Sequence, residues 1–229
     1  MNRKMSEAAA HPEIAGESNS GAVNPNRGGR ALAMRIALTA AALVIWFGTQ
    51  AWIGARSLPA SGIGDGLQAA TAPVNSYLLT HPAAANALLL VSSGIVDILG
   101  IFLLAKWILG ASLRPFLGLV IVLGLRQIMQ ACVALPAPPN AIWHNPGFPS
   151  IFVTYGVAHD YFFSGHTAIA VLGAGEMARV GRPWLTVFAV GIVMFEIFVV
   201  LALRAHYTMD VFTGGVTALY AIYLAERFK

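Results

Sequence analysis

Two short segments of the 229-residue chain carry side chains whose types and spacing could do chemistry. The first contains Asp160, Ser164, Gly165 and His166, directly before an apolar run. Ser164 suits the N-cap of a helix that begins there, and the unpaired N–H groups at a helix N-terminus suit a phosphate. His166 would then lie on the first helical turn, beside a bound anion.

The second segment contains Arg204, His206 and Asp210. The i, i+4 spacing predicts His206 and Asp210 on one face of a helix. The carboxylate could then accept the proton of one imidazole nitrogen and leave the other nitrogen free to attack. Arg204 could fork onto phosphate oxygens. Together the two segments offer a nucleophile, an acid/base group and an anion site, which phosphoryl transfer needs.

The composition tells where such chemistry would take place. Only 10% of the residues are charged and 57% are hydrophobic, whereas a soluble domain carries roughly a quarter charged residues. With its long apolar runs, the chain is predicted to be an integral membrane protein. A single cysteine excludes a disulfide framework within the chain. The net charge of +4 is scattered, which gives no reason to expect a nucleic-acid partner.

A membrane span needs about 20 mostly apolar residues, and six runs approach or exceed that length. We therefore predict an all-α, polytopic membrane protein with six transmembrane helices. A disordered cytoplasmic tail is predicted over residues 1–30 and a six-helix membrane catalytic domain over 31–229. The predicted spans are 31–55, 84–108, 114–135, 165–181, 184–203 and 207–226.

The distribution of lysine and arginine predicts the topology. These residues lie in the N-terminal tail, after the second and fourth spans and at the C-terminus, whereas loop 56–83 holds one arginine and loop 136–163 none. By the positive-inside rule both termini are cytoplasmic and both candidate segments face outward. The short, alanine-rich chain favours a bacterial cytoplasmic membrane, with the site facing the periplasm or exterior.

Each segment alone has a simpler interpretation. An isolated Ser-Gly-His at a membrane boundary is more often an interfacial turn, and an isolated His-x3-Asp is more often a structural pair. Because both occur at the outer ends of their helices, the catalytic interpretation is favoured.

The two segments resemble the histidine motifs of the sphingomyelin synthase family, a branch of the type 2 phosphatidic acid phosphatase superfamily. Those motifs are close to Asp-x3-Ser-Gly-His-Thr and His-Tyr-Thr-x-Asp-Val. A softer resemblance lies between residues 125 and 138. The corresponding residues here are Asp160, Ser164, Gly165, His166 and Thr167; His206, Tyr207, Thr208, Asp210 and Val211; and Leu125 with Arg126.

The resemblance implies a metal-independent and cofactor-independent phosphotransferase. By it, His206 is the nucleophile that takes the phospho-head-group, Asp210 orients it, and His166 protonates the leaving oxygen and then deprotonates the acceptor hydroxyl. The substrate-binding residues would be Ser164, Gly165, Arg204, Asp160, Arg126 and Tyr207. The family implies phosphatidylcholine or phosphatidylethanolamine as donor and ceramide as acceptor; a bacterial relative would leave diacylglycerol as an alternative.

Two rivals to a transferase remain open. A lipid phosphatase or phospholipase-C-like hydrolase would use water as acceptor, and a non-enzymatic transporter or scaffold would have kept the motifs. The superfamily's Lys-x6-Arg-Pro motif is one residue too long here, from Lys106 to Arg114-Pro115, and we interpret it as an anchor of span ends.

Acidic residues inside the spans need partners or a cavity. Asp97 and Arg126 fall at similar depths and could pair. Glu196 is expected to support the site at best, and Glu176, near Arg179, to be structural.

Overall fold

The computed structural model describes residues 63–133, 135–153, 155 and 161–227, with isolated helical positions between 29 and 51. The chain divides into a unit over Met1–Ser61 and a larger unit over Gly62–Lys229. Nearly all of the predicted tail 1–30, and much of the predicted span 31–55, lie outside the described residues. In the part of the chain that is described, every regular element is a helix, as predicted.

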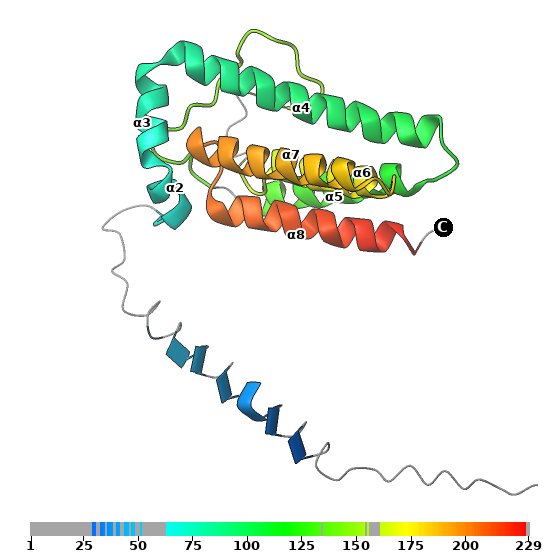
Figure 1. Cartoon of the computed structure of the whole chain (residues 1–229). Helices are drawn as coiled ribbons and strands as arrows, with labels where there is room; N and C mark the ends of the chain where they lie inside the picture. The colour runs from blue at the N-terminus through cyan, green and yellow to red at the C-terminus, as the bar shows by residue number, and fades with distance from the viewer. Residues whose placement is uncertain are drawn as a thin grey trace, which may run out of the picture. The chain divides into compact units, whose positions relative to one another are not determined.

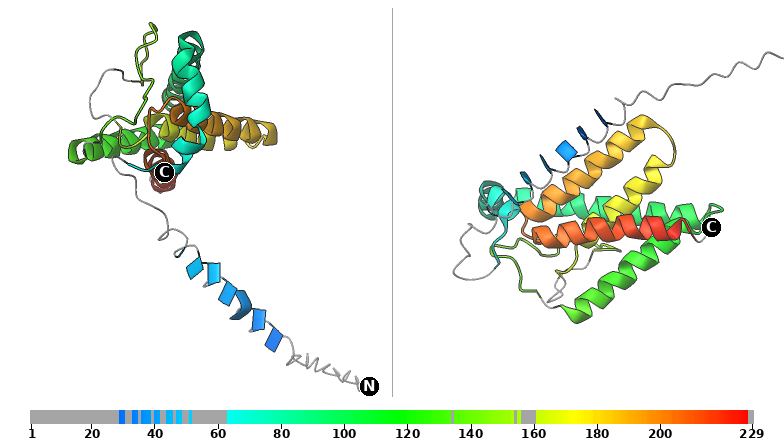
Figure 2. Two further views of the ribbon diagram at one scale, coloured as in Figure 1. Left: turned by 90° about the vertical axis from the view of Figure 1, so that its left-hand side faces the viewer. Right: turned by 90° about the horizontal axis from the view of Figure 1, so that it is seen from below.

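Five long helices of the larger unit form a bundle, and two short helices precede them. The bounds are α2 (Gly66–Ala70), α3 (Ala72–Thr80), α4 (Pro82–Ile108), α5 (Arg114–Cys132), α6 (Gly165–Ala178), α7 (Pro183–Ala202) and α8 (Thr208–Ala225). Figure 1 shows α2 and α3 across one end of the bundle, where α7 ends and α8 begins. The left view of Figure 2 looks onto that end.

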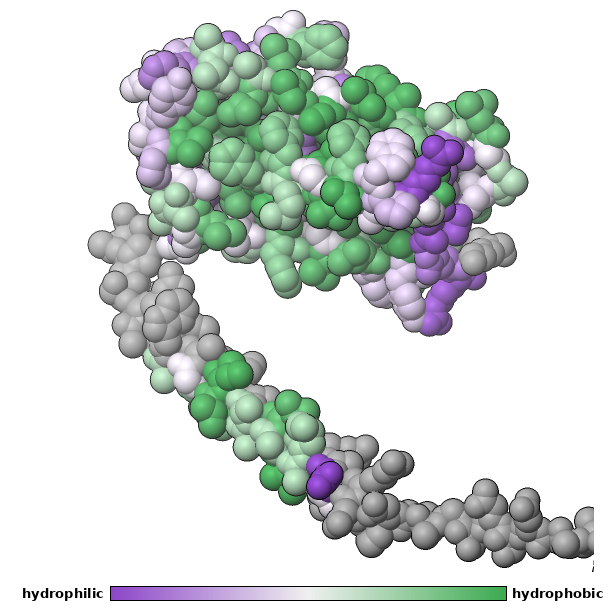
Figure 3. Space-filling model, viewed as in Figure 1, coloured by the Kyte–Doolittle hydropathy of each residue, from purple (hydrophilic) through white to green (hydrophobic). Residues whose placement is uncertain are grey.

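Four helices agree with predicted spans. By length and composition, α4, α5, α7 and α8 could each cross a membrane. Their outer faces expose large apolar side chains, such as Ile98 (67% exposed), Val187 (73%) and Phe212 (71%). In Figure 3 hydrophobic residues cover the side of the bundle and hydrophilic ones gather toward its ends. This pattern indicates an integral membrane protein.

The predicted span over 165–181 differs from the structure. There, α6 has 14 residues, about 21 Å at the usual rise, which is short for a span. It contacts α4, α5, α7 and α8. Small residues permit this close packing, because a Cβ on Gly173 or Gly175 would lie 2.8 Å from Leu99 or 2.7 Å from Ile222. The glycine- and alanine-rich run therefore forms the central helix of the bundle.

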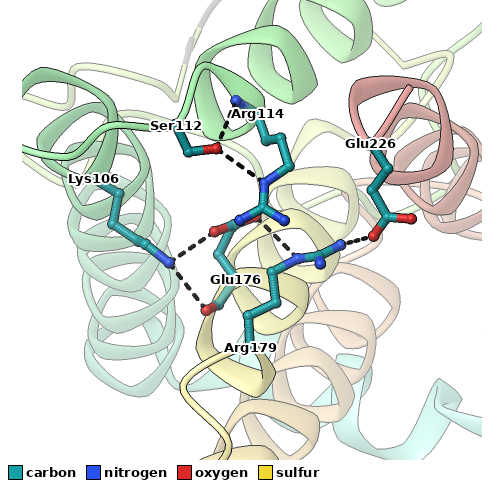
Figure 4. Close-up of polar contacts among 6 residues, drawn as sticks. All are labelled: Lys106, Ser112, Arg114, Glu176, Arg179 and Glu226. Atoms are coloured by element: carbon teal, nitrogen blue, oxygen red, sulfur yellow. Dashed lines mark hydrogen bonds and ion pairs between the residues drawn. The ribbon is translucent and has the colours of Figure 1, made fainter. Parts of the chain in front are cut away.

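An ion-pair network ties the helices together at the end away from α2 and α3 (Figure 4). Lys106 Nζ lies 2.8 Å from Glu176 Oε2, and Arg179 contacts both Glu176, at 3.3 Å, and Glu226. Glu176 is thus structural, as expected. Arg114 lies here too and donates to Ser112 Oγ at 3.0 Å. This location agrees with an anchor of span ends and not with a phosphate site beside the histidines.

Candidate active site

Both motif histidines line one cavity at the α2–α3 end of the bundle, with an empty volume of about 530 Å³, solvent at its mouth included. Arg126 of α5 and Gly165, the first residue of α6, line it as well. The cavity therefore brings together residues of the first motif (Gly165 and His166), of the second motif (His206) and of the softer resemblance (Arg126). The rest of the wall is apolar or aromatic.

His206 lies in the turn before α8 and not on the helix itself, because α8 begins at Thr208. Its Nδ1 lies 2.8 Å from the carbonyl oxygen of Tyr161 and 3.7 Å from Oδ2 of Asp210. Since a carbonyl can only accept, we assign the ring proton to Nδ1. Nε2 then keeps the lone pair that a nucleophile needs. Asp210 therefore lies near the His206 ring as a negative charge, as the i, i+4 spacing predicted. The hydrogen bond of Nδ1, however, is made to the Tyr161 carbonyl.

Asp210 joins the two motifs. It is fully buried, its Oδ2 accepts from the backbone N–H of Tyr207 at 2.8 Å, and its Oδ1 has no hydrogen-bond partner among the described residues. Its own carbonyl accepts from the N–H of Ser164 at 3.1 Å. The same residue therefore caps α8, places a negative charge near His206 and holds the start of α6.

His166 stands on the first turn of α6, as predicted. Ser164 is the N-cap and accepts from Thr167 N at 3.3 Å. The rings of His166 and Trp143 form a T-shaped contact, with centroids 5.3 Å apart. Its Nε2 is buried and lacks a hydrogen-bond partner in the described part of the chain. A buried nitrogen without a partner, on a side chain that lines the cavity, could hydrogen-bond to a substrate oxygen that reaches it.

Arg126 lies over the N-terminus of α6. Its Nε donates to the Phe163 carbonyl at 3.0 Å, and a Cβ on Gly165 would lie 3.3 Å from that nitrogen. A larger residue here would require the guanidinium to shift by a few tenths of an ångström. A cation beside a helix N-terminus makes an anion site.

Among the other predicted substrate residues, Ser164 caps α6 and does not line the cavity. Two more lie elsewhere, and Asp160 falls outside the described residues. Arg204 points to α2, where its Nη1 and Nη2 donate to Oε1 and O of Gln68 at 3.1 and 3.0 Å. Tyr207 is the buried N-cap residue of α8. Neither residue lines the cavity.

The acids inside the spans also have other partners than expected. Asp97 accepts from Ser150 Oγ and Phe152 N, both at 2.9 Å, and from Ile151 N, so it holds a loop against α4 instead of pairing with Arg126. Glu196 accepts from Ser92 Oγ at 2.6 Å and does not line the cavity.

Sequence analysis missed two groups of residues. The aromatic side chains of Trp143, Phe152 and Tyr161 line the cavity. Asp65 and Gln68 contact the His206 turn from α2. Their loop was recognisable only by its glycine, proline and serine content, which carries no signal for such contacts.

Comparison with known proteins gives one family and one relative. The AtPDCT1/2 family model matches residues 65–227. Phosphatidylcholine:diacylglycerol cholinephosphotransferase 1 of Arabidopsis thaliana is 22% identical over 159 residues, which cover 69% of this chain and 52% of that protein. The chain thus spans about half the length of this relative. No solved structure matches the chain significantly.

The match supports the predicted class of lipid phosphotransferase through the AtPDCT1/2 family, and the finer assignment to the sphingomyelin synthase family stays a prediction. By its name, the relative transfers phosphocholine, which is one of the head groups that the resemblance implied. The matched range contains both histidine motifs, Arg126 and α2, so the chain belongs to the AtPDCT1/2 family.

Proposed function

We propose that this protein is a membrane phosphotransferase that moves phosphocholine from phosphatidylcholine to diacylglycerol through a phosphohistidine at His206. The observation that carries the proposal is the shared cavity of His166 and His206, with Arg126 at the N-terminus of α6. The name of the Arabidopsis relative supports the choice of donor and acceptor. Ceramide, the acceptor of the sphingomyelin synthase resemblance, is the alternative lipid alcohol.

In the first half-reaction Nε2 of His206 attacks the donor phosphorus. An N–P bond forms and the P–O bond to the glycerol oxygen breaks, while His166, which the bound phosphate anion favours in its protonated form, gives its proton to that oxygen. In the second half-reaction His166 takes the proton of the acceptor hydroxyl, whose oxygen forms a new P–O bond as the N–P bond breaks. The two histidines return to their starting states, and the acceptor diacylglycerol has become phosphatidylcholine.

The surrounding charges suit the transition states. Positive charge develops on the His206 ring, and Asp210 Oδ2 lies 3.7 Å from its Nδ1. Negative charge on the phosphoryl oxygens would meet the Arg126 guanidinium and the N–H groups at the start of α6. These protein groups can stabilise the positive and the negative charge of the transition state by themselves.

The aromatic wall favours choline over ethanolamine. A trimethylammonium group has no N–H to donate and is recognised by aromatic faces. Trp143, Phe152 and Tyr161 line the same cavity as the two histidines. A phosphate at the start of α6 would leave the choline end among these rings.

The test is a transfer assay with the purified full chain in detergent micelles. Dioleoyl phosphatidylcholine labelled in choline is the donor, and dipalmitoyl glycerol, ceramide or no acceptor is added. We expect labelled dipalmitoyl phosphatidylcholine, at a rate well above the release of water-soluble phosphocholine. Release of phosphocholine at a rate indifferent to both acceptors would contradict the proposal and favour the hydrolase. Faster transfer to ceramide would keep the mechanism and change the acceptor.

A further inference from the structure

The turn that carries His206 is held from outside the cavity by the short helix α2. Gln68, the third residue of α2, is 3% exposed, and its Nε2 donates to the backbone carbonyl of His206 at 3.0 Å. The other end of the same amide accepts from Arg204 Nη1 at 3.1 Å. The amide thus bridges two residues of the turn, one of which is the proposed nucleophile.

Asp65 holds the other end of the turn. Its Oδ2 accepts from the backbone N–H of Thr208 at 2.6 Å and its Oδ1 from the Thr208 hydroxyl at 2.5 Å. Oδ1 also accepts from Leu67 N and Gln68 N, which makes Asp65 the N-cap of α2. Burial opposes ionisation, but these hydrogen bonds outweigh it and hold the pKa of Asp65 below its ordinary value. One carboxylate therefore caps α2 and α8 together.

The turn needs such support because its own backbone is strained. Arg204 has a φ of 57°, in the left-handed region where a long side chain is uncommon. Such a conformation persists only where the surroundings impose it. The two hydrogen bonds that the Arg204 guanidinium donates to Gln68 hold the side chain and so help to impose this backbone conformation.

We propose that Gln68 and Asp65 are positioning residues for His206, and that Arg204 holds Gln68 in place instead of binding phosphate. The catalytic part of this inference rests on the proposed function. Loss of the Gln68 amide would let the His206 ring drift from the line of attack on phosphorus. A misplacement of about 1 Å can lower a rate by about 100-fold.

The kinetic test compares Gln68→Met with Gln127→Met in the full chain. Both replace glutamine by an apolar residue of similar length, but Gln127 is exposed on α5 and outside the cavity. In phosphocholine transfer, we expect Gln68→Met to lower kcat about 10- to 100-fold with an unchanged donor KM. Gln127→Met should match the wild type. Gln68→Glu keeps an acceptor for Arg204 and loses the donor to His206, so it should be slow as well.

A second measurement does not depend on activity. Diethyl pyrocarbonate acylates accessible imidazole, and peptide mass spectrometry reports its rate at each histidine. His206 is 4% exposed, so it should react slowly in the wild type and in Gln127→Met, and several-fold faster in Gln68→Met. If the wild type transfers no head group, the proposed function fails and this labelling alone decides the inference.

The inference is overturned if a folded Gln68→Met variant shows unchanged labelling at His206, or an unchanged kcat where the wild type is active. Folding is checked by thermal melting in the same detergent. A Gln68→Met protein that melts below the assay temperature is replaced by Thr208→Val, which removes only the hydroxyl bond to Asp65. The same two outcomes then apply.

Discussion

At the scale of the residue, the sequence predicted one site for the two histidines and Asp210, and the structure brings these residues together, but their hydrogen bonds were not predictable. The spacing predicted that Asp210 accepts the proton of one imidazole nitrogen of His206, whereas the Tyr161 carbonyl lies closer to Nδ1, at 2.8 Å against 3.7 Å. Tyr161 is 45 residues away in sequence. A contact of that kind depends on how the loop before α6 folds, which residue types and local spacing do not encode.

This geometry sets the expected cost of Asp210→Asn. The Tyr161 carbonyl still fixes the tautomer, so only the negative charge beside the His206 imidazolium is lost. We expect kcat to fall by about 100-fold, the scale of removing one preorganised electrostatic contact, with little change in donor KM. Steady-state transfer kinetics measure this, and a circular dichroism melt checks that α8 keeps its cap. A kcat within a few-fold of wild type would remove Asp210 from the mechanism.

The aromatic wall makes a prediction about the head group. Trp143→Leu should raise the KM for phosphatidylcholine about tenfold, the scale of a desolvated cation–π contact, and should change the KM for phosphatidylethanolamine much less. Trp184→Leu is the matched control, because Trp184 lies exposed on α7. Donors with identical acyl chains are compared in the same micelles. Equal changes in both KM values would show that Trp143 does not recognise choline.

At the scale of the element, four spans could be predicted to within a few residues, because long apolar runs are an unambiguous signal. The central helix α6 begins where the span 165–181 was predicted and is three residues shorter, and α2 and α3 were taken for loop. Apolar composition says that a segment is buried, but does not separate burial in lipid from burial in protein, and it carries little signal for short helices such as α2 and α3. For α6, the close contacts of its glycines show which applies.

The contact between α8 and the start of α6 can be tested through a glycine. A Cβ on Gly214 of α8 would lie 2.5 Å from the Ser164 carbonyl oxygen, so Gly214→Ala must separate the two motifs. We expect a loss of stability of about 1–3 kcal/mol, as for overpacking, and a lower kcat. Gly191→Ala on α7 meets nothing within 4 Å and should stabilise the helix by about 0.5–1 kcal/mol. Thermal melts in detergent compare the two; equal shifts would contradict the close approach.

At the scale of the whole molecule, the larger unit has two unlike ends. One carries α2, α3 and the histidine cavity. The other carries the turns after α4 and α6, with Lys106, Arg114 and Arg179 around Glu176. Sequence analysis placed these two groups on opposite sides of the membrane, and ten residues of α6 separate His166 from Glu176, about 15 Å along the helix. The structure also places the two groups at opposite ends of the bundle. Which side of the membrane each end faces is a proposal.

The positive-inside rule assigns the basic end to the cytoplasm and the histidine cavity to the exterior or periplasm. Single cysteines test this in a Cys132→Ser background, which itself should show no labelling. Ser76 is exposed on α3, at the cavity end, and Val180 is exposed in the turn after α6. We expect an impermeant maleimide added to intact cells to label Ser76→Cys at once and Val180→Cys only after permeabilisation. The reverse pattern would leave the bundle and its chemistry unchanged, but would place the phosphocholine donor in the cytoplasmic leaflet, because the cavity and α3 share one end of the molecule.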